Sequence, residues 1–442
     1  MTKTLIFDTV STKLRRIAQL AKEDPGRSFL SLAHHIDGAF LREAYRLTRK
    51  DGAVGVDGQT SDEYAANLDS NLVDLLNRFK SGTYVAPSVR RVHIPKGDGK
   101  TRPLGIPTFE DKILQRAVAM VLGAVYEQDF LPCSHGFRPK RSAHGALRGL
   151  RETLMEMKGG WLLDVDLRAF FDTLDHGQLR TILDHRVRDG VLRRMIDKWL
   201  KAGILEKGEL RYPEEGTPQG GVISPLLANI YLHTVLDTWF ERDVRPVMRG
   251  RAFMIRYADD FVMGFQHEKD ARRVQEVLSK RVERFGLTLH PEKTRLLPFC
   301  RPAADAAPSP SSTPPEPGTF DFLGFTHLWA QSRNGFWVIK RQTARRRLVR
   351  ALKAVSQWCR HNYHRSTTDQ QAILASKLRG HYQYYGVCGN FAALARFRWC
   401  VERLWRRWLS RRSQRGSLNW VRFKALLARH PLPAPRTYPI VT

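Results

Sequence analysis

The stretch 256–262, Arg-Tyr-Ala-Asp-Asp-Phe-Val, is the feature that most constrains what this chain can fold into. Two short apolar runs, 253–255 and 261–265, flank the adjacent aspartates Asp259 and Asp260. This pattern predicts a β-hairpin that carries both acids at its turn. Neighbouring carboxylates repel each other and stay ionised mainly where a strong cation neutralises them. A solvent-exposed acidic turn is the plainer interpretation of the same residues.

A third aspartate, Asp166, ends another apolar stretch, 161–167, which predicts a strand. Beside the hairpin, the three acids would offer the oxygen ligands that Mg²⁺ prefers, as in a two-metal phosphoryl-transfer site. Asp164 shares the face of Asp166 because side chains alternate along a strand, so the pattern leaves it as a rival ligand. Asp166 could instead cap the segment that follows it.

The charge of the chain points to a polyanionic partner. Its 442 residues carry a net charge of +29, and residues 340–442 contain 23 Lys or Arg against two acids, Asp369 and Glu402. Nucleic acid is the commonest partner of such a surface. A passive ribosomal-type binder would be equally basic, so charge does not separate an enzyme from a scaffold.

The cysteines and the hydropathy exclude several classes. The five cysteines include no Cys-x-x-Cys pair, which argues against a structural zinc site, a disulfide framework and an appended zinc-containing nuclease domain. No apolar run approaches the roughly 20 residues of a transmembrane helix, and the N-terminus does not resemble a signal peptide. We therefore expect a cytoplasmic protein with no membrane partner.

Five further residues are candidates for nucleotide handling. Lys96 and Arg102 flank a glycine-rich loop and could clamp a triphosphate, although a solvated basic hairpin is equally plausible. Gln219 precedes two glycines that would let backbone approach a nucleotide, or simply form a helix-entry turn. Phe171 could exclude a 2′-hydroxyl or belong to the core. Lys293 could protonate pyrophosphate or be an ordinary surface lysine.

The last hundred residues predict basic helices with one buried and one cationic face. Aromatic residues are interleaved with the arginines, and most of them should form the domain's own core. The remainder could stack on unpaired bases, each worth about 1–3 kcal/mol. The residues that we expect to contact RNA are Arg346, Arg350, Lys353, Arg379, Tyr382 and Tyr385.

Seven blocks in fixed order resemble the reverse transcriptases encoded by bacterial group II introns, the intron maturase family. The resemblance covers roughly residues 35–400. The blocks are 94–107, 134–139, 166–172, 216–231, 257–260, 291–294 and 322–325, and the run 378–386 resembles the maturase thumb.

The resemblance implies an α+β right-hand polymerase of fingers, palm and thumb, with an antiparallel palm sheet that carries the Asp-Asp hairpin. The implied domains are an N-terminal helical extension (1–60), the fingers and palm (61–340, with a disordered Pro-rich insertion at about 302–318) and a basic helical thumb or maturase domain (341–442). The resemblance implies that two Mg²⁺ ions are bound by Asp166, Asp259 and Asp260, and that the triphosphate is contacted by Lys96 and Arg102. It implies that Gln219 lies at the nucleotide and template region and that Phe171 is the sugar gate. It also implies that Lys293 is a general acid and that residues 322–325 form the primer grip.

The expected function is RNA-directed DNA synthesis by an enzyme that binds group II intron RNA, assists its splicing and copies it during retrohoming. Its partners would be the intron RNA template, a DNA primer or target, and dNTPs. The alternative is a domesticated enzyme of phage defence, DNA repair or a CRISPR-associated system. The three acids argue against a non-enzymatic splicing cofactor, and Phe171 argues against an RNA-dependent RNA polymerase.

The chain departs from the family pattern in three places. Arg168 and Ala169 stand where the family often has Lys and Gly, which we expect to be mild changes. The Pro-rich stretch lengthens the connection to the primer grip. No His-Asn-His nuclease pattern follows the thumb, so mobility would depend on a borrowed primer. The sequence does not indicate an oligomeric state.

Overall fold

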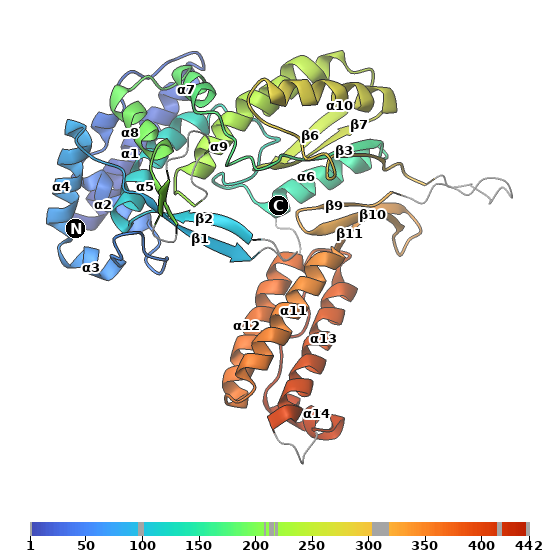
Figure 1. The fold of residues 1–442 in the computed structure, drawn as a ribbon. Helices are drawn as coiled ribbons and strands as arrows, with labels where there is room; N and C mark the ends of the chain where they lie inside the picture. Colours follow the sequence, from blue (N-terminus) through green and yellow to red (C-terminus); the bar gives the residue numbers. More distant parts are fainter. Residues whose placement is uncertain are drawn as a thin grey trace. The chain divides into compact units, whose positions relative to one another are not determined.

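A computed structural model describes residues 2–95, 101–206, 209–211, 216, 220–302, 318–412 and 418–438. The chain forms two units (Figure 1). One comprises Met1–Ala146 with Leu162–Leu296, and the other comprises Leu147–Trp161 with Leu297–Thr442. The three-domain division expected from the sequence stays a prediction.

Helices make up about half of the described chain. They are α1 (Thr2–Glu23), α2 (Gly38–Leu47), α3 (Ser61–Ala66), α4 (Leu68–Ser81), α5 (Phe109–Tyr126), α6 (Ala143–Glu156), α7 (His176–Asp184), α8 (Gly190–Leu200), α9 (Ser224–Leu232), α10 (Glu268–Glu283), α11 (Arg345–Asn362), α12 (Thr367–Tyr385), α13 (Phe391–Leu409) and α14 (Trp420–Arg429).

The strands fall into three sheets. They are β1 (Val89–Pro95), β2 (Thr101–Ile106), β3 (Trp161–Asp166), β4 (Ile204–Glu206), β5 (Glu209–Arg211), β6 (Ala252–Tyr257), β7 (Asp260–Phe265), β8 (Arg295–Pro298), β9 (Phe320–Phe322), β10 (Phe325–Gln331) and β11 (Trp337–Thr343). The strand orders are β2-β1-β4-β5, β6-β7-β3-β8 and β11-β10-β9.

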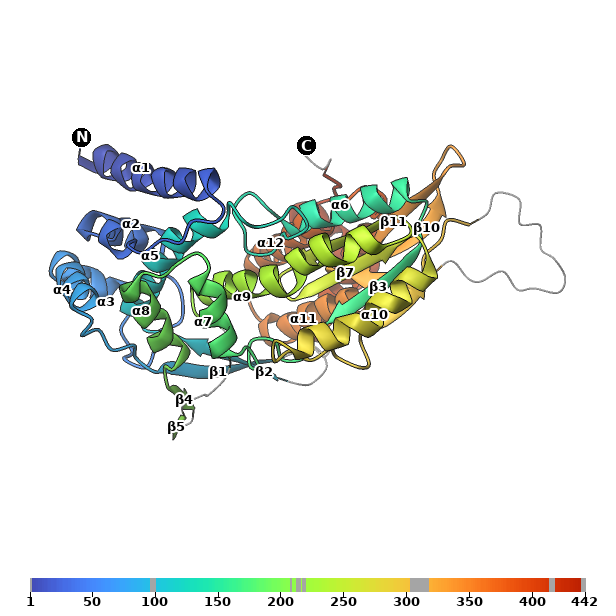
Figure 2. The same ribbon diagram turned by 90° about the horizontal axis from the view of Figure 1, so that it is seen from above.

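Helix α5 is the buried centre of the helical part of the first unit. Its apolar side chains are covered on several sides, and α1, α2 and α9 pack against it (Figure 2). A helix that is apolar nearly all round is stable only when buried in this way. Because of this burial, its two buried polar side chains, Asp111 and Gln115, must find partners inside the protein.

The sheet β6-β7-β3-β8 positions the candidate site. Every residue of β7 after Asp260 is buried, as expected for a strand whose sequence is a continuous apolar run. Helix α10 packs on β7 (Figure 2), and its buried side chains include Val274 and Leu278. The sequence also predicts a basic amphipathic helix from about residue 269 to residue 285, and this segment corresponds to α10.

The sequence also predicts helices at 61–80 and 226–239, and both differ in detail from the structure. The segment 61–80 is interrupted at Asn67, which separates α3 from α4. The segment 226–239 begins as α9 and continues through a π-helical turn, His233–Asp237, followed by a second one, Phe240–Val244. Such turns insert an extra residue into the helical repeat and are frequent near functional sites.

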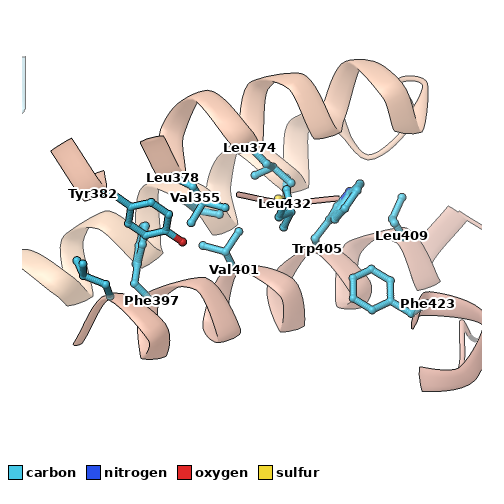
Figure 3. Close-up of a cluster of buried hydrophobic side chains, with 12 residues drawn as sticks. Val355, Leu374, Leu378, Tyr382, Phe397, Val401, Trp405, Leu409, Phe423 and Leu432 are labelled. Atoms are coloured by element: carbon cyan, nitrogen blue, oxygen red, sulfur yellow. The ribbon is translucent and has the colours of Figure 1, made fainter. Parts of the chain in front are cut away.

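The second unit contains the sheet β11-β10-β9 and a bundle of α11, α12 and α13, with α14 beyond it (Figure 1). The core of the bundle is apolar (Figure 3) and includes Val355, Leu378, Val401 and Trp405. Residues 303–317, which include most of the expected Pro-rich insertion, lie outside the described residues. Among the described helices, none is both long and apolar enough to cross a membrane.

Candidate active site

A two-residue connection between β6 and β7 carries Asp259, and Asp260 is the first residue of β7. The strands pair antiparallel with Tyr257 opposite Asp260, so Ala258 and Asp259 form the turn. Ala258 takes a left-handed conformation, with φ of 58°, and is buried. This backbone conformation costs an alanine roughly 1–2 kcal/mol, so surrounding contacts must hold the turn.

The electrostatic environment of Asp259 is unfavourable for an isolated carboxylate. Burial raises the pKa of Asp259, and the charge of Asp166 raises it further. A backbone hydrogen bond and the charges of Arg102 and Arg256 act in the lowering direction but do not restore the ordinary value. A cation between the two carboxylates would relieve this repulsion.

Asp166 lies at the end of β3, the strand next to β7. Its carbonyl accepts a hydrogen bond from His290 N (2.8 Å), which fixes the loop 290–294 beside the strand end. Lys293 of that loop forms an ion pair with the Asp166 carboxylate. The structure therefore brings two of the expected catalytic residues into contact.

Asp164, the rival ligand, is engaged elsewhere. Arg295 Nη2 lies 3.1 Å from its Oδ2. Asp164 lies two residues before the end of β3. Asp166 lies at the end of the strand, and its charge acts on Asp259. This geometry favours Asp166 over Asp164 as a partner of the turn.

The buried side chain of Arg256 supports the turn from inside the protein. Its side chain is fully buried, and Asp237 Oδ2, also fully buried, lies 2.5 Å from its Nη2. All five guanidinium N–H groups have acceptors: Asp237 Oδ1 (2.7 Å) and Oδ2, Asn229 Oδ1 (2.9 Å), Ser134 Oγ (2.8 Å) and the carbonyl of Ala258 (3.0 Å). One side chain thus links the turn to three other segments of the first unit.

The Arg256–Asp237 pair is stable as an ion pair despite its burial. Burial acts to raise the pKa of Asp237, but the charge and hydrogen bonds of Arg256 more than offset it and lower the pKa below its ordinary value. The pKa of Arg256 is raised, since the attraction of Asp237 outweighs the lowering by burial. No role for Arg256 was predicted from the sequence, although a charge inside an apolar strand is a visible signal of one.

Gly136 packs directly against the turn. A Cβ built on it would lie 2.4 Å from the backbone nitrogen of Ala258. The Gly136 carbonyl accepts a hydrogen bond from Asn229 Nδ2 (2.7 Å), and Asn229 also contacts Arg256. The block 134–139 therefore acts on the site through backbone that supports the aspartates.

The expected nucleotide residues are only partly described. Arg102 is exposed on β2, opposite Ile94 of β1, and its charge acts on Asp259. Phe171 is half-buried and packs edge-to-face on Phe170, with ring centroids 5.2 Å apart. Lys96 and Gln219 lie outside the described residues.

The structure corrects the expectation that Ala169 in place of glycine is a mild change. Its φ is 48°, in the left-handed region that favours glycine, and its carbonyl accepts hydrogen bonds from Asp172 N and Thr173 N. The turn needs this conformation to lead from β3 toward Phe171. Alanine in place of the family's glycine therefore introduces local strain.

The carboxylates are not gathered into a ready-made metal site. Over the part of the chain that the structure describes, no three His, Cys, Asp or Glu side chains are grouped as metal ligands. The donor set nevertheless suits a divalent cation, because its oxygens are hard ligands and the charges of Asp166 and Asp259 oppose each other.

The cationic candidates of the second unit lie on helices α11 and α12. Arg346, Arg350, Lys353 and Arg379 are exposed. Arg346 also forms a loose pair with Asp321, at 3.6 Å. These side chains are available to an anionic partner.

Tyr382 is a correction: it cannot offer a stacking face. It is 2% exposed and lies in the bundle core (Figure 3) because it follows Leu374 and Leu378 at four-residue spacing on the buried face of α12. Tyr385 is half-buried and packs on His381 and Phe325. Among the tryptophans, Trp405 is core, whereas Trp399 is 51% exposed.

Comparisons with known proteins identify the family. The family described as "Reverse transcriptase (RNA-dependent DNA polymerase)" matches residues 94–327, more than half of the chain. Protein YkfC of Escherichia coli (strain K12) is 36% identical over 288 residues, which cover 58% of this chain and 75% of YkfC. Group II intron-encoded protein LtrA of Lactococcus lactis subsp. cremoris is 32% identical over 307 residues, 66% of this chain and 50% of LtrA.

A plant protein, the mitochondrial Nuclear intron maturase 4 of Arabidopsis thaliana, is 25% identical over 197 residues, 43% of this chain and 23% of its own length. The match to this chain thus spans three quarters of YkfC but half of LtrA. The family match contains Asp166, Asp259, Asp260 and Lys293. The chain therefore belongs to the reverse transcriptase family, and it is similar to an intron-encoded protein and an intron maturase.

Proposed function

We propose that this protein is an RNA-directed DNA polymerase that binds group II-type intron RNA, assists its splicing and copies it during retrohoming. The observation that carries the proposal is the placement of Asp166 and the Asp259–Asp260 turn at the ends of neighbouring strands, inside a chain of the reverse transcriptase family. Relatives named as an intron-encoded protein and an intron maturase favour this function over phage defence, repair or a CRISPR-associated role.

In this proposal the first unit provides the fingers and palm. Asp166, Asp259 and Asp260 would hold two Mg²⁺ ions, which supply charge stabilisation for phosphoryl transfer when bound. Lys96 and Arg102 would contact the triphosphate, and Gln219 the nucleotide and template region. Phe171 would exclude the 2′-hydroxyl.

Lys293 is proposed as the general acid for pyrophosphate. Its ion pair with Asp166 supports this placement, because the ammonium group lies beside a carboxylate that would face the reacting phosphates. A protonated lysine there can also balance the charge of the acids before substrate binds. The expected consequence is that Lys293→Ala slows DNA synthesis more than it weakens dNTP binding.

The second unit would provide the thumb that holds RNA. On α13 the exposed side chains recur at helical spacing and include Arg396, Trp399, Arg403 and Arg407. Arg403 lies over the Trp399 ring, 4.5 Å from its centroid. Alternating guanidinium and aromatic groups suit phosphates and unpaired bases respectively. This face supports RNA binding better than the buried Tyr382 does.

The test is primer extension by the purified protein on a defined RNA template with a DNA primer, dNTPs and Mg²⁺. We expect extension by the wild type and none above background by the double variant Asp259→Ala/Asp260→Ala. Extension by the double variant would overturn the assignment of the acids. RNA that copurifies with the protein should be one structured transcript from the flanks of its own gene, whereas a diffuse population would favour the domesticated alternative.

A further inference from the structure

A buried chain of hydrogen bonds connects helix α5 with the segment that precedes α9. Asp111 and Gln115 are one turn apart on α5 and are 1% and 3% exposed. Asp111 Oδ1 accepts hydrogen bonds from Trp199 Nε1 (2.7 Å) and Tyr84 Oη (3.0 Å), and Oδ2 accepts one from Gln115 Nε2 (2.8 Å). Gln115 Oε1 accepts from the backbone N–H of Val222 (2.7 Å).

This chemistry fixes the orientation of the Gln115 amide. An ionised carboxylate only accepts hydrogen bonds and a backbone N–H only donates them. The amide nitrogen must therefore face Asp111, and the amide oxygen must face Val222. A rotated amide would set donor against donor and acceptor against acceptor, which is costly inside a protein.

The segment held by Gln115 lies close to β2. Gly220 has φ of 120°, and a Cβ built on it would lie 2.4 Å from the carbonyl oxygen of Gly105. Gly105 belongs to β2, which also carries Arg102. Two contacts thus set the path of residues 220–223: Gly220 against β2 and Val222 against Gln115.

We infer that Gln115, oriented by Asp111, is a positioning residue for the incoming dNTP. It acts through the backbone of residues 220–223, which directly follow Gln219. The inference rests on the proposed function, because it requires that this segment border the nucleotide. Nothing in the proposed chemistry otherwise uses the buried pair.

Two variants separate positioning from general stability. Gln115→Met keeps the size of the side chain but leaves the Val222 N–H without its acceptor. Asp111→Asn is nearly isosteric and does not touch the segment. The oxygen of the new amide at position 111 must accept the hydrogen bonds from Trp199 and Tyr84, so its NH₂ group faces Gln115. The Gln115 amide must then rotate, which turns its own NH₂ group toward the N–H of Val222. The matched control is Gln19→Met, on the exposed face of α1.

The measurements are KM and kcat for dNTP in primer extension, together with hydrogen–deuterium exchange of a peptide that contains Val222. We expect both variants to raise the KM for dNTP by about tenfold, the factor that corresponds to roughly 1.4 kcal/mol. The kcat should change less, and amide exchange should rise in this peptide. The control should match the wild type in both measurements.

Unchanged KM and unchanged exchange in Gln115→Met would overturn the inference, as would a loss in kcat with KM constant. A wild type that extends no primer would refute the proposed function. Exchange would then still show whether Gln115 holds the segment, so the two failures are distinguishable.

Discussion

Replacing Arg256 by methionine should be among the most damaging single changes to the first unit. The substitution removes the guanidinium that pairs with Asp237, whose side chain is fully buried. Leaving one member of a buried ion pair without its partner costs about 3–5 kcal/mol. Typical domains are stable by only about 5–15 kcal/mol, so the variant should lose a large part of the margin.

A second variant separates the effect of the unpaired Asp237 charge from the effect of the lost hydrogen bond to the turn. In Arg256→Met/Asp237→Leu no buried charge remains, and apolar replacement of a buried pair is often neutral or stabilising. We therefore expect the double variant to be more stable than Arg256→Met. DNA synthesis should remain low in both, because neither can donate a hydrogen bond to the carbonyl of Ala258.

The assay is urea-induced unfolding followed by fluorescence, with primer extension measured on the same samples. The matched control is Arg245→Met, since Arg245 and its partner Glu241 are both largely exposed and such pairs contribute little. The reasoning is refuted if Arg256→Met unfolds within about 1 kcal/mol of the wild type, or if the double variant is no more stable than the single one.

Four shorter predictions follow from the same geometry. Gly136→Ala should destabilise the protein by about 1–3 kcal/mol and reduce primer extension, because the new Cβ meets the backbone of Ala258; a normal unfolding midpoint would contradict this. Ala169→Gly should preserve or increase stability, by up to about 1 kcal/mol, since it removes left-handed strain; a clear decrease in the midpoint would argue against the strain. Phe171→Ala should raise ribonucleotide incorporation relative to dNTP incorporation, and an unchanged ratio would exclude a gate. RNA affinity should fall steeply from 50 to 200 mM salt. Arg403→Gln should make the slope of log affinity against log salt less steep by about 0.7–0.9, and an unchanged slope would show that Arg403 does not contact RNA.

The sequence made the three candidate acids visible, but not the residues that support them. Strand patterning located Asp166, Asp259 and Asp260, because apolar runs that end in carboxylates are visible in the chain itself. Arg256 was missed although a charge inside an apolar strand was visible, because its partners, Asp237 and Ser134, are distant in sequence and the local pattern does not identify them.

The error at Tyr382 has a different origin. Its aromatic ring and basic neighbours suggested RNA stacking, but it follows Leu374 and Leu378 on the apolar face of α12. Helical spacing was the stronger signal, and it would have assigned the ring to the core. Strand alternation alone could not separate Asp164 from Asp166, because both lie on the same face of β3. Only the family resemblance favoured Asp166, and in the structure the two acids have different partners, Arg295 and Lys293.

The five acceptors of Arg256 also have a consequence for chimeric enzymes. They come from segments around residues 134, 229, 237 and 258, which are spread over more than a hundred positions of the chain. A graft that exchanges only the aspartate turn with that of a relative would disrupt this hydrogen-bond network. Recombination between relatives should therefore succeed at crossover points outside residues 133–260, or where all four segments are inherited from one parent.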